Sequence, residues 1–211
     1  MKLIINSVNR LINLTTATRF VPAGRTWQPI HADEPTDGRS VSLQEAVRWL
    51  QTESDQPCKV PVGVIGGRSA EPFQLEAAEE AGRIIGNMRL TLLCGGRQGI
   101  MEAACKGASA VGGLTVGLLP DDEPEMANPY VDIPLATGIG VARNALLTRA
   151  ALCLAAVGGG YGTISEIAFG LQFGKPVFAL ADPPAVDGVV RCNSHQELGD
   201  NIARTVLNLL A

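Results

Sequence analysis

The sequence predicts an α/β protein: a Rossmann-like, doubly wound parallel sheet with helices on both faces, preceded by an N-terminal arm. From Val60 onward, short apolar runs alternate with amphipathic stretches, an order typical of parallel sheets. Three of the apolar runs end in glycine-rich turns that open a helix. We therefore expect an arm over residues 1–60 and a Rossmann-like nucleotide- or phosphate-binding domain over residues 61–211.

Residues 1–60 lack the alternation. Met1–Ile5 matches a short strand, and the polar, proline- and glycine-punctuated run after it predicts an extended arm. Ser42 and Glu45 form a capping box that opens one amphipathic helix. No acidic residue precedes Asp33, a composition that transit peptides share, but we favour an ordered arm. Its two tryptophans should pack onto the main domain or onto a partner subunit.

The remaining elements follow from runs of apolar residues, helical periodicity and glycine or proline stop signals. The predicted strands are Val62–Ile65, Leu90–Cys94, Leu114–Leu119, Val131–Leu135, Leu152–Val157 and Val177–Leu180. The predicted helices are Phe73–Met88, Ile100–Val111, one carrying Arg143 and Asn144, one ending at Gly174, and Ser194–Leu210.

The stretch Val157–Glu166 is the centre of this organisation. It reads strand, glycine turn, helix, and its glycines leave the backbone open to a ligand. Thr163 and Glu166 match a second capping box. The predicted buried face of the following helix is Ile164, Ile167, Ala168 and Leu171. Free amides at a helix N-terminus above a glycine turn indicate a phosphate site.

Four loops should share the carboxyl edge of the sheet, where ligands of such folds bind. They are Gly66–Ser69, Gly95–Gly99, Thr137–Arg143 and Gly158–Thr163. None contains the dinucleotide fingerprint, the nucleoside triphosphatase P-loop or the hydrolase nucleophile elbow. The predicted phosphate- or ligand-binding residues are Gly66, Gly67, Ser69, Gly95, Gly96, Gly99, Thr137, Gly138, Asn144, Gly159, Gly160, Tyr161, Gly162 and Thr163.

Composition excludes several classes of function. A formal charge of −4 argues against a nucleic-acid partner, and no apolar run reaches the roughly 18 residues of a membrane span. The five cysteines lack metal-ligand spacing, so we expect reduced core thiols, no metal site and a cytoplasmic location. The acidic residues 121–125 could bind magnesium, although an exposed loop is the simpler interpretation.

Three motifs together resemble a known family, the LOG-like proteins, long mislabelled as lysine decarboxylases. Gly158–Thr163 with Glu166 resembles their G-G-x-G-T-x-x-E signature, and Cys94–Met101 resembles their second glycine loop. Thr137-Gly138 with Ala142–Asn144 is similar to the branch of the molybdenum cofactor carrier proteins. The resemblance runs from about Val62 to Leu180 and leaves out the arm.

This resemblance implies a homodimer or homotetramer that binds a small phosphorylated ligand and requires no cofactor of its own. In LOG enzymes that ligand is a nucleoside 5′-monophosphate, which a phosphoribohydrolase splits into base and ribose 5-phosphate. The catalytic arginine and glutamate map onto Arg143 and Glu166. In the carrier branch the ligand is the molybdenum cofactor, a pterin with a phosphate tail.

Two departures from the hydrolase pattern lean toward the carrier branch. A third glycine stands where hydrolases have proline, and Arg143-Asn144 stands where they have Arg-Lys. We therefore keep two leading hypotheses: a phosphoribohydrolase that cleaves an N-glycosidic bond, and a non-catalytic molybdenum cofactor carrier. A third, a purely structural assembly subunit, predicts no affinity for these ligands. Glu166 also has a purely structural interpretation, because a capping glutamate needs only to reach the Thr163 amide. Arg68 and Arg97 flank the crevice as screening charges or ligand contacts.

Overall fold

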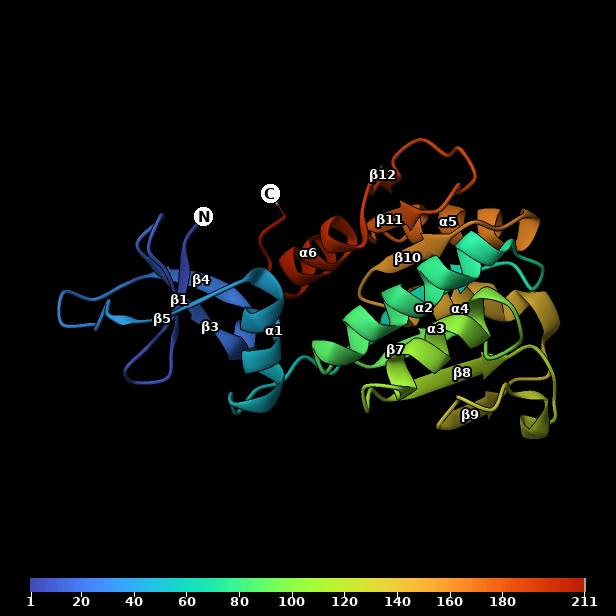
Figure 1. Ribbon diagram of the computed structural model, residues 1–211, viewed down its shortest axis with the longest axis horizontal. Coiled ribbons are helices and arrows are strands. Elements are labelled where there is room, and N and C mark those ends of the chain that lie inside the picture. Colours follow the sequence, from blue (N-terminus) through green and yellow to red (C-terminus); the bar gives the residue numbers. More distant parts are fainter. Residues whose placement is uncertain (211) are drawn as a thin grey trace.

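A seven-stranded sheet forms the centre of the larger part of the molecule in the computed structural model, which describes residues 1–210 (Figure 1). Its strands are β6 (Val62–Gly66), β7 (Leu92–Cys94), β8 (Thr115–Leu119), β9 (Ile133–Ala136), β10 (Leu154–Val157), β11 (Val177–Leu180) and β12 (Val190–Arg191). They lie in the order β12-β11-β10-β6-β7-β8-β9, and every neighbouring pair is parallel. The predicted doubly wound parallel sheet is therefore confirmed.

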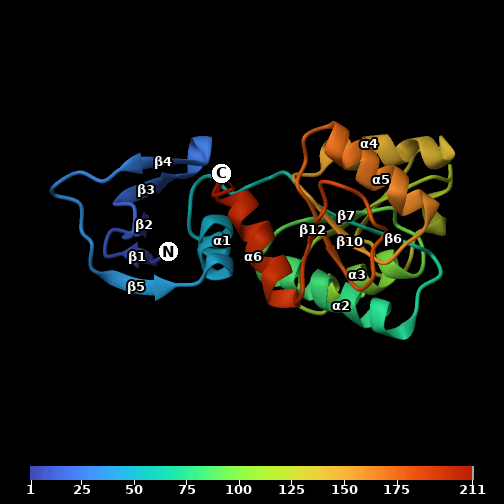
Figure 2. The same ribbon diagram turned by 90° about the horizontal axis from the view of Figure 1, so that it is seen from above.

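Helices cover both faces of this sheet (Figure 2). One layer consists of α2 (Pro72–Asn87), α3 (Ile100–Ser109) and α6 (His195–Val206), and the other of α4 (Arg143–Ala150) and α5 (Tyr161–Gln172). From β6 the chain winds outward through β7, β8 and β9, then returns to place β10 on the other side of β6. The gap between β6 and β10 is thus the topological switch point, where doubly wound proteins bind ligands.

The N-terminal segment is a second sheet, so the prediction of an extended arm is wrong. Its antiparallel strands are β1 (Leu3–Asn6), β2 (Leu11–Asn13), β3 (Thr18–Val21), β4 (Thr26–Pro29) and β5 (Gly38–Val41), in the order β4-β3-β2-β1-β5. The period-two pattern was hidden because all residues of β1 and β2 are buried, on both faces. The prolines fit as well, since Pro22 opens a 3₁₀ turn and Pro29 ends an edge strand.

Helix α1 (Leu43–Thr52) follows the N-terminal sheet, and its predicted capping box is confirmed. The Glu45 amide donates to Ser42 Oγ at 3.2 Å, and the Ser42 amide donates to Glu45 Oε2 at 2.7 Å. The buried face of α1 carries the apolar residues that the sequence places there, together with Trp49. Its buried residues are Leu43, Ala46, Val47, Trp49 and Leu50.

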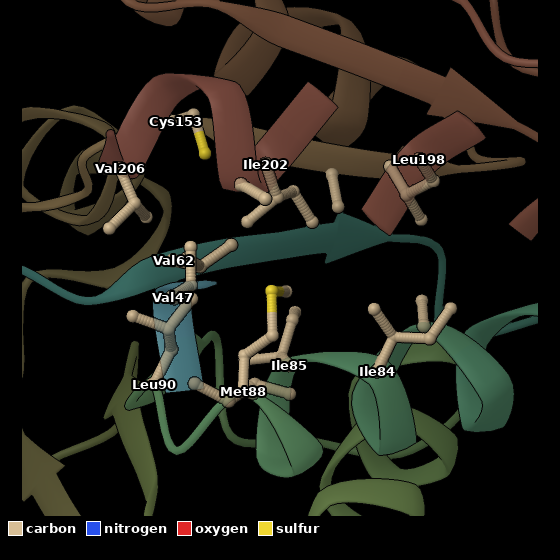
Figure 3. Close-up of a cluster of buried hydrophobic side chains, with 14 of the residues drawn as sticks. Val47, Val62, Ile84, Ile85, Met88, Leu90, Cys153, Leu198, Ile202 and Val206 are labelled. Carbon is tan, nitrogen blue, oxygen red and sulfur yellow. The ribbon is translucent and has the colours of Figure 1, made fainter. Parts of the chain in front are cut away.

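One hydrophobic core runs from the N-terminal sheet to the parallel sheet. It joins Leu3 and Phe20 of the first sheet to α1, α2 and α6, where Val47, Ile85 and Ile202 meet (Figure 3). Trp27 Nε1 donates to the Leu207 carbonyl at 2.8 Å, and Trp49 Nε1 donates to Asn9 Oδ1 at 2.7 Å. Both tryptophans thus pack within the chain. The predicted domain boundary near residue 60 stays a prediction, because residues on both sides of it belong to the same hydrophobic core.

A second core lies between the sheet and α4 and α5. It is built from Ile65, Leu93, Leu147, Leu154, Ile167 and their neighbours. Large apolar side chains are exposed on the outer surfaces of α4 and α5, among them Leu146, Ile164 and Phe169. Across residues 1–210, we find no helix that combines the length and the apolar character of a membrane span.

Candidate ligand-binding site

A cavity of about 580 Å³ opens at the switch point between β6 and β10. This volume lies within the range of small-molecule sites. Its walls come from the turn after β6, the glycine after β7, the loops around α4 and the first turn of α5. The lining residues are Val64, Ile65, Gly66, Gly67, Arg68, Gly95, Met101, Pro120, Asp121, Gly140, Val141, Arg143, Asn144, Gly160, Gly162, Thr163 and Glu166.

The first turn of α5 presents free amides at this cavity. The helix begins at Tyr161, and the Ile164 amide donates to the Gly160 carbonyl at 2.9 Å. The three preceding amides, those of residues 161–163, have no acceptor among the described residues. Such amides, together with the positive end of the helix dipole, favour an anion.

The predicted capping box at Thr163 and Glu166 is wrong. Gly160 is the N-cap and offers no side-chain bond, so Thr163 lies inside the first turn rather than before it. The buried face of α5 shifts with it, to Thr163, Glu166, Ile167 and Gly170, and leaves Ile164 and Ala168 exposed. The earlier start is possible because glycines at 160 and 162 open the helix without a capping side chain, and it frees Glu166 for another partner.

Two neighbouring glycines of the turn serve different needs. Gly159 has a φ of 111°, and a Cβ there would collide with the Thr163 side chain. Around Gly160 and Gly162, by contrast, an added Cβ would meet nothing within 4 Å. Gly159 therefore shapes the turn, whereas Gly160 and Gly162 keep the space beside the free amides open.

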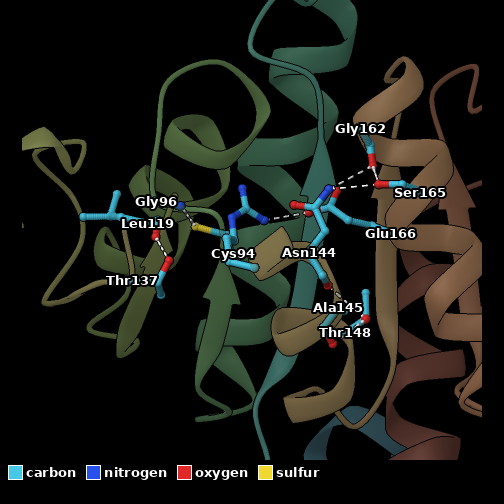
Figure 4. A network of polar contacts seen from close by, with 11 residues as sticks. Cys94, Gly96, Leu119, Thr137, Asn144, Ala145, Thr148, Gly162, Ser165 and Glu166 are labelled. Atoms are coloured by element: carbon cyan, nitrogen blue, oxygen red, sulfur yellow. Dashed lines mark hydrogen bonds and ion pairs between the residues drawn. The ribbon is translucent and has the colours of Figure 1, made fainter. Parts of the chain in front are cut away.

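A buried ion pair between Arg143 and Glu166 lines the cavity; Glu166 is labelled in Figure 4. Arg143 Nη1 donates to Glu166 Oε1 at 2.9 Å, with only 9% and 8% of the two side chains exposed. Neither Arg143 Nη2 nor Glu166 Oε2 has a hydrogen-bond partner within residues 1–210, and neither is sealed from solvent. Burial raises the pKa of the Glu166 carboxyl, while the Arg143 charge acts in the opposite direction.

Asn144 ties α4 to the start of α5. Its Nδ2 donates to Ser165 Oγ at 2.9 Å, and Ser165 Oγ donates to the Gly162 carbonyl at 2.7 Å (Figure 4). These bonds fix the helix that carries Arg143 against the helix that carries Glu166. Asn144 therefore borders the cavity as a positioning residue.

The glycine loop after β7, Gly95–Gly99, lies against the Arg143 side of the same ion pair. A Cβ at Gly95 would collide with the Arg143 guanidinium. Just beneath, Cys94 Sγ lies 3.5 Å from Cys105 Sγ, and both thiols are buried. The hydrogen bond to Cys94, together with burial, raises the pKa of the Cys105 thiol. In the described part of the chain, no three metal-ligating side chains come together.

Nine of the sixteen sequence-predicted site residues line the cavity, and the other seven do not. The lining ones are Gly66, Gly67, Gly95, Arg143, Asn144, Gly160, Gly162, Thr163 and Glu166. Those that do not line it are Ser69, Gly96, Gly99, Thr137, Gly138, Gly159 and Tyr161. Thr137 Oγ1, for example, donates to the Leu119 carbonyl at 2.7 Å, and the side chain of Tyr161 projects into solvent.

The sequence alone leaves the roles of Arg68, Arg97 and Asp121 open. Arg97 Nη1 donates to Asp121 Oδ2 at 2.8 Å, and the Asp121 carbonyl accepts from the amides of Thr137 and Gly138. Arg97 thus holds a loop of the cavity wall, while Arg68 lines the cavity itself. The acidic loop is tied to the protein through this pair. The apolar wall from Pro120 had no sequence signal, because Pro120 lies outside the four predicted loops, whereas Val141 lies within the predicted loop Thr137–Arg143.

The family model described as the SLOG cluster4 family matches residues 59–210, most of the chain. The chain belongs to the SLOG cluster4 family. The match begins at residue 59, so the N-terminal sheet and α1 lie outside the part that defines the SLOG cluster4 family.

Three relatives indicate what this SLOG cluster4 member resembles. An uncharacterized protein of Archaeoglobus fulgidus is 41% identical over 128 residues, which are 61% of this chain and 84% of that protein. The molybdenum cofactor binding protein from Rippkaea orientalis is 34% identical with a TM-score of 0.65, over 69% of this chain and 96% of that one. The molybdenum cofactor carrier protein from Chlamydomonas reinhardtii is 33% identical with a TM-score of 0.64, over 72% and 100%.

Proposed function

We propose that this protein binds a phosphorylated, nucleotide-like ligand in the cavity at the switch point, and that a phosphorylated pterin of the molybdenum cofactor type is its cargo. The single observation that carries the proposal is the free first turn of α5, open at Gly160 and Gly162, above a cavity of about 580 Å³. The likeness to proteins that bind or carry the molybdenum cofactor favours the pterin over a nucleotide.

The residues present fit such a cargo. The α5 amides suit a phosphate group. The apolar walls from Val64, Met101 and Pro120 suit a flat ring. The outer atoms of the Arg143–Glu166 pair supply one donor and one acceptor for the polar edge of that ring.

The test is a binding measurement on the full chain with three probes. Molybdenum cofactor released from a molybdoenzyme, GMP and AMP are titrated separately, and mass spectrometry identifies whatever co-purifies. We expect the cofactor to bind most tightly. A Gly162→Val variant fills the open space beside the amides and should abolish binding, whereas Ala168→Val, exposed on the same helix, should not. Absence of binding for all three probes would contradict the proposal.

Phosphoribohydrolase activity is the second candidate, favoured by one observation. Glu166 has a carboxylate oxygen free toward the cavity, and a carboxylate at such a place can stabilise an oxocarbenium-like transition state or orient water. In that reaction the α5 amides and Arg143 hold the phosphate, and Glu166 faces the ribose.

Product analysis separates the two candidates. The protein is incubated with AMP and GMP, and free base is measured by chromatography. Release of base that disappears in Glu166→Gln establishes the enzyme, because the amide cannot supply the negative charge. Retained binding without any release of base leaves the carrier.

We further infer a homodimer or homotetramer in the cytoplasm, assembled through the outer surface of α4 and α5. Exposed apolar side chains gather on these two packed helices and on the turn before them: Ile139, Val141, Leu146, Tyr161, Ile164 and Phe169. Contiguous apolar surface of this kind marks interaction sites. Val141 belongs both to this surface and to the cavity wall, so a second copy would also cover the cavity mouth.

Light scattering after gel filtration tests the assembly. Leu146→Lys combined with Ile164→Lys should give a monomer, because two charges would have to be buried. Phe73→Lys, also an exposed apolar residue but on α2, is the matched control and should keep the wild-type mass. A monomeric wild type would rule out the inferred assembly.

A further inference from the structure

The cavity is lined by four charged side chains, and three of them already have a partner. Arg143 is paired with Glu166, and Asp121 with Arg97. Arg68, the fourth, makes no ion pair and no side-chain hydrogen bond with any residue of the described chain. The formal charge that the cavity offers to a ligand therefore resides on Arg68.

The backbone of Arg68 is held in place although its side chain is free. The Ile100 amide donates to the Gly67 carbonyl at 3.1 Å. A Cβ at Gly99 would collide with the carbonyl oxygen of Arg68 and would lie 2.6 Å from that of Gly67, so the two turns are in close contact. The start of α3 thus anchors the turn after β6, and the guanidinium extends from a fixed point.

That fixed point lies beside the first turn of α5. A Cβ at Gly67 would lie 3.7 Å from Gly159 Cα, so the turn after β6 touches the glycine turn that opens the helix. An arginine side chain is long enough to reach an anion held at the amides of residues 161–163. Its planar guanidinium can donate two parallel bonds to a phosphate.

We propose that Arg68 is the residue that recognises the phosphate of the ligand and sets the preference of the site for a single phosphate group. This inference rests on the proposed function and specifies it. The sequence also predicts Arg97 beside the crevice. Arg97 has a structural role instead, because it is mostly buried and forms an ion pair with Asp121. Arg143 is already paired with Glu166 through Nη1, so its charge is partly offset before any ligand binds.

The charge balance explains the preference. A phosphate monoester carries about −1.5 to −2 at pH 7. One arginine and one helix N-terminus, worth roughly half a charge, together nearly neutralise it. A diphosphate would bring further negative charge to a cavity whose other cations are already paired. The ligand class is therefore a monophosphate ester with an uncharged ring system.

The experiment compares Arg68→Ala, Arg68→Lys and Arg39→Ala by calorimetric titration, at low and at physiological salt. The probe is whichever of AMP, GMP and molybdenum cofactor the wild type binds most tightly, and ADP is titrated as the diphosphate. Arg39 is the matched control: an exposed arginine on β5, in the other sheet. Circular dichroism verifies the fold of each variant, and Arg68 has no side-chain bond whose loss would disturb it.

We expect Arg68→Ala to weaken binding about tenfold and to reduce its salt dependence. Arg68→Lys should recover part of the loss, and Arg39→Ala should match the wild type. The wild type should bind AMP more tightly than ADP, and Arg68→Ala should bind both weakly. If the wild type binds a probe and Arg68→Ala binds it equally well, the role of Arg68 is wrong while the proposed function stands. An equal loss in Arg39→Ala would also overturn it. If the wild type binds none of the probes, the proposed function itself fails.

Discussion

Among residues 1–210, two glutamates are buried, each paired with arginine, and they differ in whether the pair faces a cavity. Glu34 lies in the connection between β4 and β5, where Oε1 accepts from Arg10 at 3.0 Å and Oε2 from Arg19 at 3.5 Å. Glu166 lies at the cavity, where only Oε1 is bound, to Arg143 at 2.9 Å. Both are almost fully buried, with 1% and 8% of the side chain exposed.

The difference is in the atoms left over. Glu34 has both oxygens occupied and holds the connection that crosses between the two edge strands of its sheet. Glu166 keeps one oxygen, and its arginine keeps one nitrogen, available to the cavity. An unpaired Nε does not distinguish the pairs, because Arg19, Arg97 and Arg143 all have one. Burial alone thus indicates that an ion pair stabilises the fold. An ion pair that also leaves polar atoms without a partner beside a cavity indicates a ligand-binding site.

Removing Glu34 should have the largest effect on stability. Glu34→Ala leaves Arg19 without its partner, and breaking a buried pair on one side costs about 3 kcal/mol of unfolding free energy. Urea unfolding measures this loss. Ligand affinity at the distant cavity should stay at the wild-type value, and a parallel drop in affinity would contradict the separation of the two pairs.

The glycine turn allows the same distinction within two adjacent residues. Gly159→Ala should destabilise the protein by about 2 kcal/mol, because φ is 111° and the new Cβ meets Thr163. Thermal unfolding measures the difference.

Gly160→Ala is the companion variant, since its Cβ meets nothing within 4 Å. Its unfolding free energy should change by less than about 0.5 kcal/mol, while ligand affinity falls because the methyl group stands beside the free amides. Equal destabilisation by the two variants would mean that both glycines only shape the turn.

A pH series sharpens the contrast at Glu166. Burial is the chief reason why the pKa of Glu166 in the folded protein is raised above its ordinary value of 4.5. Between pH 4.5 and this raised pKa, the folded state therefore binds more protons than the unfolded state. This contribution to stability is present at low pH and is lost as pH rises from 4.5 through the folded pKa. Gln cannot take up this proton, so the difference in unfolding free energy between wild type and Glu166→Gln should change across this pH range. Urea unfolding at stepped pH measures it, and parallel curves would contradict it.

The smallest effect is expected at Arg10. Half of its side chain is exposed, and Glu34 keeps Arg19 when Arg10 is removed. Arg10→Ala should therefore cost about 0.5 kcal/mol, as surface pairs do. A loss as large as that of Glu34→Ala, measured by the same urea unfolding, would show that Arg10 alone carries the buried carboxylate.

The parallel sheet could be predicted from sequence because three of its strands, β6, β7 and β10, are buried apolar runs followed by a glycine turn. The N-terminal sheet could not, because β1 and β2 are buried on both faces, and the prolines and glycines of its connections match an extended arm equally well. Asn9, Ala17 and Arg25 adopt positive φ there without glycine, which removes the usual signal of a turn.

The candidate site divides in the same way. Motifs identified the glycine turns, and the resemblance to LOG-like enzymes assigned Arg143 and Glu166 to one site, but the ion pair between them could be seen only in the structure. The start of α5 was misplaced since Thr163 and Glu166 satisfy the capping pattern as written. The sequence does not show which of Arg68 and Arg97 pairs with Asp121. That pairing depends on where the loop after β8 lies against the sheet.

The hydrogen bond from Trp27 to the Leu207 carbonyl closes a loop of 180 residues. Helix α6 packs between α1 and α2, so the first sheet shares its interior with the last helix. During synthesis on the ribosome, the N-terminal strands must then wait for nearly the whole chain to emerge before their core is sealed. Late closure of this kind favours slow folding and leaves apolar strands exposed to chaperones in the meantime.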